Sequence, residues 1–162
     1  MKDSKIVKYE GRAIIKQINN SLEITNKLLS LATVKIVHFD DHRIFTEGVR
    51  NWIGRKTANI LITSINEYYA SLDCITKRFQ ICEKIDLIIT DFNHPGPNGY
   101  EFAKAVKELV KEYKVFTPIL LLTFVSGDEP IVLRGIEEKI FDKYLPKSAG
   151  GDEIIAAIKS LT

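Results

Sequence analysis

The sequence predicts an α/β fold, a doubly wound sheet of five parallel strands with an extra N-terminal helix. From Val34 onward, short apolar runs alternate strictly with longer amphipathic ones. The apolar runs are continuous rather than alternating, which is typical of strands buried on both faces of a helix-covered sheet. A chain of 162 residues has room for one such domain, at 34–162, and a small extension, at 1–33.

Each strand is predicted from β-branched or apolar residues that end at a polar side chain, and each helix from apolar positions at helical spacing. The strands are predicted at 34–39, 59–65, 85–91, 117–124 and 143–146. The helices that follow them are predicted at 44–54, 67–79, 100–113, within 128–140, and at 151–161. Gly54 is interpreted as a stop signal for the first of these helices.

Residues 1–33 lie outside this alternation and contain one amphipathic segment. Ile15, Ile18, Leu22 and Leu29 recur near a 3–4 spacing, with Thr25 at the intervening position, which predicts a helix that ends before Val34. We favour packing of this helix against its own domain, because a coiled coil normally needs three to four clean heptads. The alternative is a short coiled-coil seam that joins a homodimer.

Composition excludes several classes of protein. Hydrophobic content of 45% and charged content of 27% are typical of a soluble globular chain, and a net charge of +2 gives no argument for nucleic acid. Cys74 and Cys82 have the spacing of neither a zinc site nor a redox motif. The N-terminus lacks the apolar core of a signal peptide, and the most apolar run, 118–125, is far shorter than a membrane span. We therefore expect a cytoplasmic protein with reduced thiols and no membrane partner.

Polar side chains stand at the carboxyl ends of four predicted strands, where a doubly wound sheet binds its ligand. They are Asp40, Asp41, Asp91, Thr123 and Lys147. Taken singly, each has an ordinary explanation as a helix cap, a strand residue or a surface charge. Together, crowded carboxylates require a counter-ion, and oxygen-only ligands favour Mg²⁺. The set predicts a phosphoryl-transfer site with a carboxylate nucleophile, a hydroxyl and a cation.

These motifs have a counterpart in a known family. From Val34 to Thr162 the chain resembles the receiver domain of bacterial two-component response regulators, which has a flavodoxin-like fold. The resemblance rests on the acidic pair in "HFDDH", the turn "TDFNHPGPNG", the hydroxyl residue in "LLLTF" and the lysine in "YLPKSAG". The segments "DDHRIFTEGV" and "KSAGGDEIIAAI" are most similar to the LuxR-type branch.

The resemblance implies a Mg²⁺-dependent phosphoacceptor in a phosphorelay. Asp91 would accept a phosphoryl group from a sensor histidine kinase or a phosphotransfer protein. Thr123 would hydrogen-bond that group, Lys147 would pair with it, and Tyr144 would be an aromatic switch residue. The face formed by the fourth helix, fifth strand and fifth helix of the domain would carry the signal to a partner or output domain. The implied metal ligands are Asp40, Asp41, Asp91 and the backbone carbonyl of Asn93.

Two alternatives remain at the level of sequence. The chain could be a degenerate receiver that acts only as a protein-interaction module. It could also be a haloacid-dehalogenase-type phosphatase, although Asn93 replaces the second aspartate of that family's D-x-D motif. We expect a signalling domain rather than an enzyme, with at most slow autodephosphorylation.

LuxR-type regulators usually carry a C-terminal helix-turn-helix domain, but the sequence ends at Thr162 with the last predicted helix. A stand-alone receiver and an excised fragment are both compatible with this, and no nucleic-acid binding is assigned to these residues. Two side chains depart from the family pattern. We expect the bulk of Phe124 to narrow access to Asp91, and we interpret His94 as a solvent-facing loop residue outside the site.

Overall fold

The computed structural model describes residues 14–25 and 33–162. The chain divides into two compact units, Met1–Thr33 and Val34–Thr162. In the first unit, residues 14–25 form a helix on which Ile15, Ile18 and Leu22 are exposed. Leu29, the last residue of the predicted apolar seam, lies outside the described residues. What this seam packs against therefore stays a prediction.

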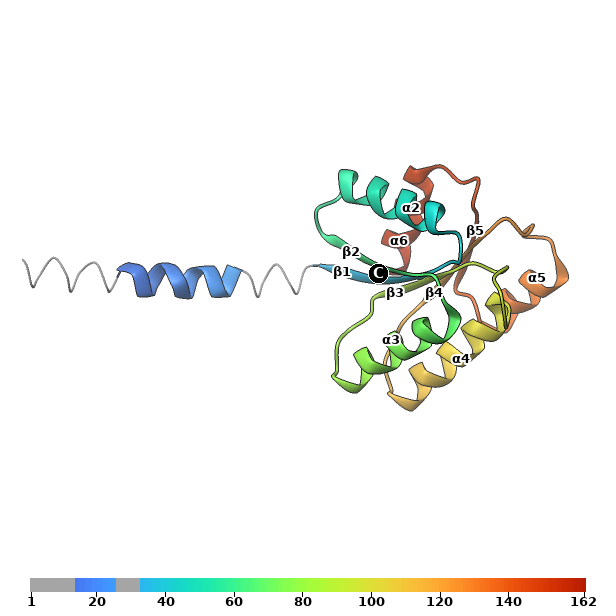
Figure 1. The fold of residues 1–162 in the computed structure, drawn as a ribbon, viewed down its shortest axis with the longest axis horizontal. Coiled ribbons are helices and arrows are strands. Elements are labelled where there is room, and N and C mark those ends of the chain that lie inside the picture. Colours follow the sequence, from blue (N-terminus) through green and yellow to red (C-terminus); the bar gives the residue numbers. More distant parts are fainter. Residues whose placement is uncertain (1–13, 26–32) are drawn as a thin grey trace, which may run out of the picture. The chain divides into compact units, whose positions relative to one another are not determined.

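The second unit is a single parallel sheet with helices on both faces, which confirms the predicted fold (Figure 1). Its strand order is β2-β1-β3-β4-β5. The second strand is added on one side of β1 and the later strands on the other, so the switch point of the sheet lies between β1 and β3. The strands are β1 (Val34–Phe39), β2 (Ile60–Ile65), β3 (Leu87–Thr90), β4 (Ile119–Thr123) and β5 (Lys143–Pro146). The helices are α2 (Arg43–Lys56), α3 (Tyr68–Gln80), α4 (Gly99–Glu112), α5 (Pro130–Glu137) and α6 (Gly151–Leu161).

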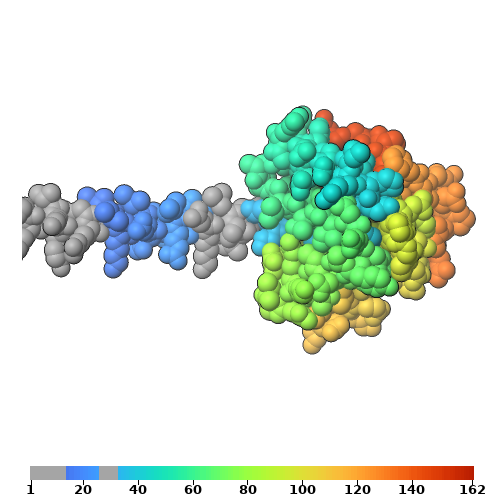
Figure 2. Space-filling model, viewed as in Figure 1, coloured from blue at the N-terminus to red at the C-terminus, as the bar shows by residue number. Residues whose placement is uncertain are grey.

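Two apolar cores hold this arrangement together, one on each face of the sheet. Ile36 of β1 packs with side chains of α2 and α6, whereas its neighbour Val37 packs with α3 and α4. Every residue of β3 and β4 is buried, which explains why these strands read as continuous apolar runs. In the space-filling view, α2 and α3 lie closely packed on either side of the β2 edge (Figure 2).

The interpretation of Gly54 as a helix stop was wrong. Helix α2 continues to Lys56, and the N–H of its C-cap residue, Thr57, donates to the carbonyl of Ile53. Gly54 is exposed, and a Cβ added to it would meet no atom within 4 Å. Because glycine is only mildly unfavourable inside a helix, packing of Val49 and Ile53 against the core carries the helix past it.

None of the helices in the described ranges combines the length and the apolar character needed to cross a membrane.

Candidate functional site

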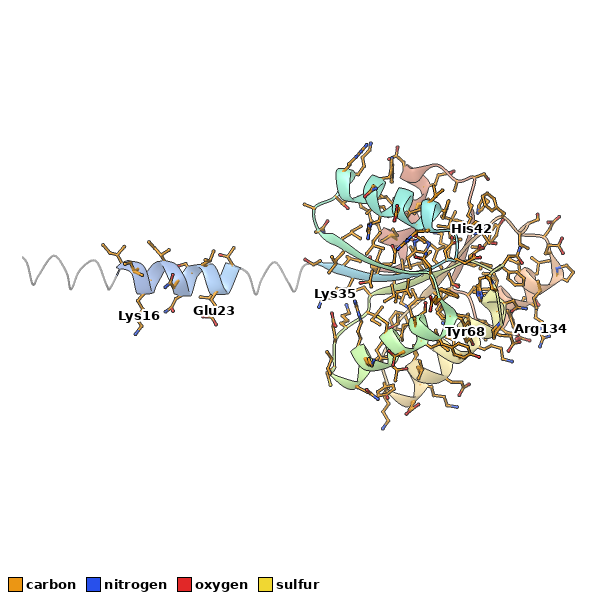
Figure 3. All side chains as sticks on the ribbon, in the orientation of Figure 1. Lys16, Glu23, Lys35, His42, Tyr68 and Arg134 are labelled. Atoms are coloured by element: carbon orange, nitrogen blue, oxygen red, sulfur yellow. The ribbon has the colours of Figure 1, made fainter. Side chains whose placement is uncertain are left out.

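The carboxyl edge of the sheet brings the predicted site residues together. β1 and β3 pair Phe39 with Thr90, so Asp40 and Asp91 leave the sheet side by side. β4 and β5 pair Thr123 with Pro146, and the N–H of Lys147 donates to the Thr123 carbonyl at 2.8 Å. Figure 3 marks both edges: Lys35 lies at the amino end of β1 and His42 lies beyond its carboxyl end.

Lys147 supplies the charge that balances the buried carboxylates. Its Nζ lies 2.6 Å from Oδ2 of Asp91 and 2.7 Å from Oδ2 of Asp40. Its side chain and that of Asp40 are fully buried, and the Asp91 side chain is only 2% exposed. One ammonium group therefore lies between two carboxylates and offsets part of their repulsion in a site of low dielectric constant.

Four side chains are close enough to share one metal ion. A ligand atom from each of Asp40, Asp41, His42 and Asp91 lies within 4.8 Å of the others. Burial raises the pKa of Asp40, while Lys147 and the N–H of His42 act in the opposite direction. Three carboxylates crowded in this way are hard oxygen donors that suit a divalent cation such as Mg²⁺. The three carboxylates of this cluster thus fit the predicted ion.

His42 is a member of this cluster that the sequence interpretation missed. Its Nδ1 lies 3.3 Å from Oδ1 of Asp40, 3.2 Å from Oδ1 of Asp41 and 4.0 Å from Oδ2 of Asp91. The available signal was its position directly after the acidic pair. Asn93 lies in the exposed loop that follows Asp91, and its backbone carbonyl stays a predicted ligand.

Thr123 and Tyr144 are connected through the backbone of one residue. The buried Thr123 hydroxyl oxygen accepts the N–H of Val125 at 3.2 Å. The Tyr144 hydroxyl donates to the carbonyl of the same Val125 at 3.0 Å. The Tyr144 ring also packs on Gly127, where an added Cβ would lie 2.8 Å from it. Both predicted switch residues therefore hold the segment that follows β4.

The loop after Asp91 is closed tightly onto the start of α4. The Gly99 N–H donates to the Phe92 carbonyl at 2.8 Å, and the Asn98 side chain caps the helix by accepting the Glu101 N–H at 3.0 Å. A Cβ on Gly99 would lie 2.2 Å from the Asp91 carbonyl oxygen. The glycine is thus required for the close approach that fixes the backbone of Asp91.

The interpretation of His94 as solvent-facing was wrong. Its ring is half-buried beneath the loop, with its centroid 4.3 Å from that of Phe39 and 6.0 Å from that of Tyr68. Burial lowers the pKa of His94. The side chain packs as a neutral aromatic group between the loop and the rings of Phe39 and Tyr68.

His38 is a second histidine beneath the site, and nothing in its strand-like sequence context distinguished it from a core residue. It is fully buried in β1, with Nε2 3.9 Å from Oδ2 of Asp40. Neither ring nitrogen has a hydrogen-bond partner within the described part of the chain. Burial, aided by the charge of Lys147 and opposed by Asp91, lowers the pKa of His38 to about 3.

This lowered pKa predicts a loss of stability in acid. In the unfolded chain His38 has its ordinary pKa and becomes protonated below about pH 6.5, whereas in the folded domain it stays neutral. The free energy of unfolding therefore falls as the pH drops below about 6.5. When the pH is lowered from about 7 to about 4.5, the free energy of unfolding should fall by roughly 2–3 kcal/mol less in His38→Leu than in the wild type. Urea unfolding at both pH values measures the difference. The raised pKa of Asp40 has the opposite effect on stability, but Asp40 is present in both proteins and its contribution cancels in the comparison. If the unfolding free energies of the two proteins changed in parallel with pH, the prediction would be contradicted.

Comparisons with known proteins agree with this geometry. The model of the response regulator receiver domain matches residues 36–159. The transcriptional regulatory protein CpxR of Escherichia coli is 28% identical over 127 residues, covering 78% of this chain and 48% of CpxR. The probable transcriptional regulatory protein NarL of Mycobacterium tuberculosis is 26% identical over 125 residues, covering 77% of this chain and 53% of NarL. The chain thus spans only about half the length of these relatives.

Solved structures show the same architecture. The signal receiver domain of the M. tuberculosis NarL has a TM-score of 0.64 at 25% identity, covering 79% of this chain and 94% of that domain. The Vibrio cholerae chemotaxis protein CheY4 has a TM-score of 0.67 at 24% identity, covering 81% of this chain and all of CheY4. With the family model matching most of the sequence, the chain belongs to the response regulator receiver domain family and is a two-component signalling domain.

Proposed function

We propose that this receiver accepts a phosphoryl group on Asp91 from a histidine kinase or a phosphotransfer protein. The observation that carries the proposal is the position of the Lys147 ammonium, 2.6 Å from Oδ2 of Asp91 and 2.7 Å from Oδ2 of Asp40. This cation is placed to meet the oxygens of a group attached to Asp91. A purely structural ion pair would not need the additional carboxylate and imidazole of Asp41 and His42 beside it.

In the proposed reaction, a carboxylate oxygen of Asp91 attacks phosphorus. The bond between phosphorus and the donor's imidazole nitrogen breaks, and its electron pair leaves on that nitrogen. Oδ1 of Asp91 accepts the N–H of Phe92 at 2.6 Å, which orients the carboxylate. Lys147 and the Thr123 hydroxyl provide donors for the phosphoryl oxygens.

Asp40, Asp41 and Asp91, with the backbone carbonyl of Asn93, would hold Mg²⁺. When bound, this ion would neutralise charge on the phosphoryl group. Lys147 pairs with Asp40 as well as Asp91, so one of its three N–H donors is left for a phosphoryl oxygen.

The product carries a local switch. A phosphoryl group adds about −1.5 to −2 charge and three strong acceptors. To donate its O–H to one of them, the Thr123 side chain would turn inward and give up the N–H that it accepts from Val125. The carbonyl of the same Val125 accepts the Tyr144 hydroxyl. Movement of this segment would change the surface formed by α5, β5 and α6, which we propose as the signalling face toward a partner or output domain.

Intact-protein mass spectrometry tests the proposal. After treatment with phosphoramidate and Mg²⁺, the wild type should gain the mass of one phosphoryl group and Asp91→Asn should gain none. Beryllofluoride binding in the presence of Mg²⁺ provides an independent measurement. If neither reagent modifies the wild type, the domain is a protein-interaction module. Repeated release of phosphate from esters would instead identify a phosphatase.

A further inference from the structure

Two phenylalanine rings lie against the ammonium group of Lys147, in addition to the two carboxylates that it binds. Its Nζ lies 4.7 Å from the ring centroid of Phe45 and 5.1 Å from that of Phe124. The two ring centroids are 6.4 Å apart, with an angle of 57° between the planes. An ammonium group over an aromatic face is attracted by the ring quadrupole, and more strongly when water is excluded. The Lys147 side chain is fully buried, so this attraction acts on a desolvated charge.

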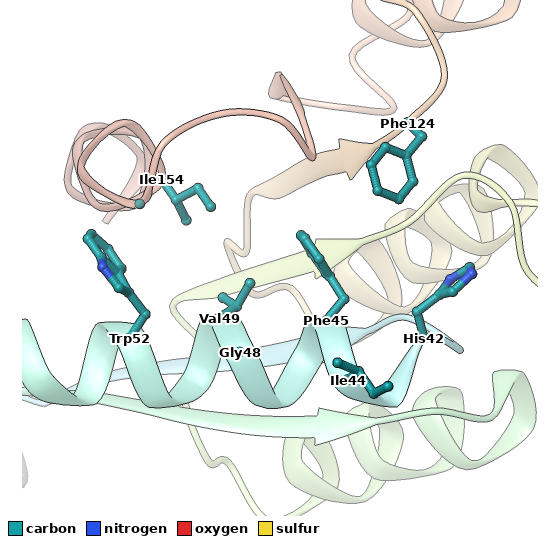
Figure 4. A pocket seen from close by; sticks show the side chains of 9 residues that line it. His42, Ile44, Phe45, Gly48, Val49, Trp52, Phe124 and Ile154 are labelled. Carbon is teal, nitrogen blue, oxygen red and sulfur yellow. The ribbon is translucent and has the colours of Figure 1, made fainter.

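The rings of Phe45 and Phe124, which together form the aromatic cap on Lys147, come from two separate elements. Phe45 lies in the first turn of α2, and Phe124 directly follows β4. Both border a mostly apolar pocket of about 500 Å³ between α2 and α6, in which Phe124 stands at the His42 end (Figure 4). The Phe124 side chain remains 72% exposed. Core packing therefore does not hold this ring in place, and contact with Phe45 and Lys147 does.

The cap lies where a phosphoryl group would have to enter. An ammonium has three N–H donors, and in Lys147 the carboxylates of Asp91 and Asp40 take two directions. The side covered by Phe45 and Phe124 is the remaining one. Phe124, exposed and held by few contacts, is the ring that can turn aside.

We propose that Phe124, held against Phe45 and Lys147, is a specificity-determining residue that restricts access of small, free phosphodonors to Asp91. This inference rests on the proposed phosphoacceptor function. The relevant donor class is an acyl phosphate such as acetyl phosphate. Its phosphorus forms a bond with an Asp91 carboxylate oxygen as the bond to the acyl oxygen breaks. Acetate leaves with that electron pair, so one carboxylate replaces another and no further reactant is required.

The experiment compares phosphorylation rates with acetyl phosphate and Mg²⁺, followed by intact mass. Phe124→Ala should react roughly tenfold faster than the wild type, from the combined loss of the ring contact and its bulk. Phe124→Tyr keeps the ring and should retain the wild-type rate. Phe116→Ala is the matched control, because Phe116 is 80% exposed and precedes β4 at the opposite edge of the sheet. It should also react at the wild-type rate.

Donor size provides a readout that a general loosening of the fold would not reproduce. The gain in Phe124→Ala should be larger with acetyl phosphate than with the smaller phosphoramidate. Equal rates for the wild type and Phe124→Ala would overturn the inference, as would the same gain in Phe116→Ala. Absence of labelling and of beryllofluoride binding in every variant would instead overturn the proposed function, and the donor selectivity with it.

Discussion

Replacing Lys147 by methionine is expected to lower the free energy of unfolding by about 3 kcal/mol near neutral pH without divalent cation. Among the described residues, Lys147 is the only lysine or arginine within salt-bridge distance of both Asp40 and Asp91, and the substitution removes it. Methionine fills a similar volume, so the loss is electrostatic rather than a cavity. Both carboxylates then remain buried with no cation between them. Lys159→Met, at an exposed position of α6, is the matched control.

Two additions make this prediction specific. Mg²⁺ should restore part of the lost stability, because the acidic cluster regains a counter-ion. Lower pH should also reduce the loss, because burial raises the pKa of Asp40 and the carboxyl group can take up a proton. Urea unfolding with and without Mg²⁺ measures both effects. A loss no larger than that of Lys159→Met would show that the buried ion pair contributes little.

Gly99→Ala should be the most disruptive change to the loop that carries Asp91. The added Cβ would lie 2.2 Å from the Asp91 carbonyl oxygen and 2.7 Å from the Phe92 Cα. Both are backbone atoms, so no side chain can turn away to relieve the overlap. We expect a loss of about 3 kcal/mol or more in unfolding free energy. Phosphorylation should slow as well, because the loop backbone orients the Asp91 carboxylate.

Gly54→Ala separates this clash from the general effect of adding a methyl group. Gly54 is exposed within α2 and has open space around its Cα. Alanine there should stabilise the domain by about 0.5–1 kcal/mol, since it restricts the unfolded chain and favours helix. Thermal unfolding of both variants beside the wild type gives the comparison. Wild-type stability in Gly99→Ala would mean that the loop relaxes more easily than its contacts indicate.

The sheet and the positions of Asp40, Asp91, Thr123 and Lys147 could be predicted from sequence for one physical reason. Parallel strands end at a common edge, so residues far apart in the chain converge once the strands are identified. The pattern of apolar runs was sufficient for that. It did not give the chemical roles of these residues, which stay proposals.

Side-chain contacts between elements were beyond the reach of sequence patterns. The sequence pattern did not show that His38 has a different environment from its apolar neighbours. In a strand that is buried on both faces, polar and apolar residues do not alternate, so the pattern does not indicate which way a side chain points. The packing of His94 on Phe39 depends on how the loop folds back over β1. The cap on Lys147 joins Phe45 and Phe124, which are separated by most of the domain and meet only through the register of β1, β3 and β4.

The backbone bridge at Val125 has a consequence for how this domain tolerates change. Thr123 bonds its N–H and Tyr144 bonds its carbonyl, so neither contact uses the valine side chain. Communication between the two would therefore survive most amino acids at position 125. Proline is the exception, because it lacks the N–H. The two hydrogen bonds therefore place no demand on the side chain at position 125, which is constrained only by its packing against the core.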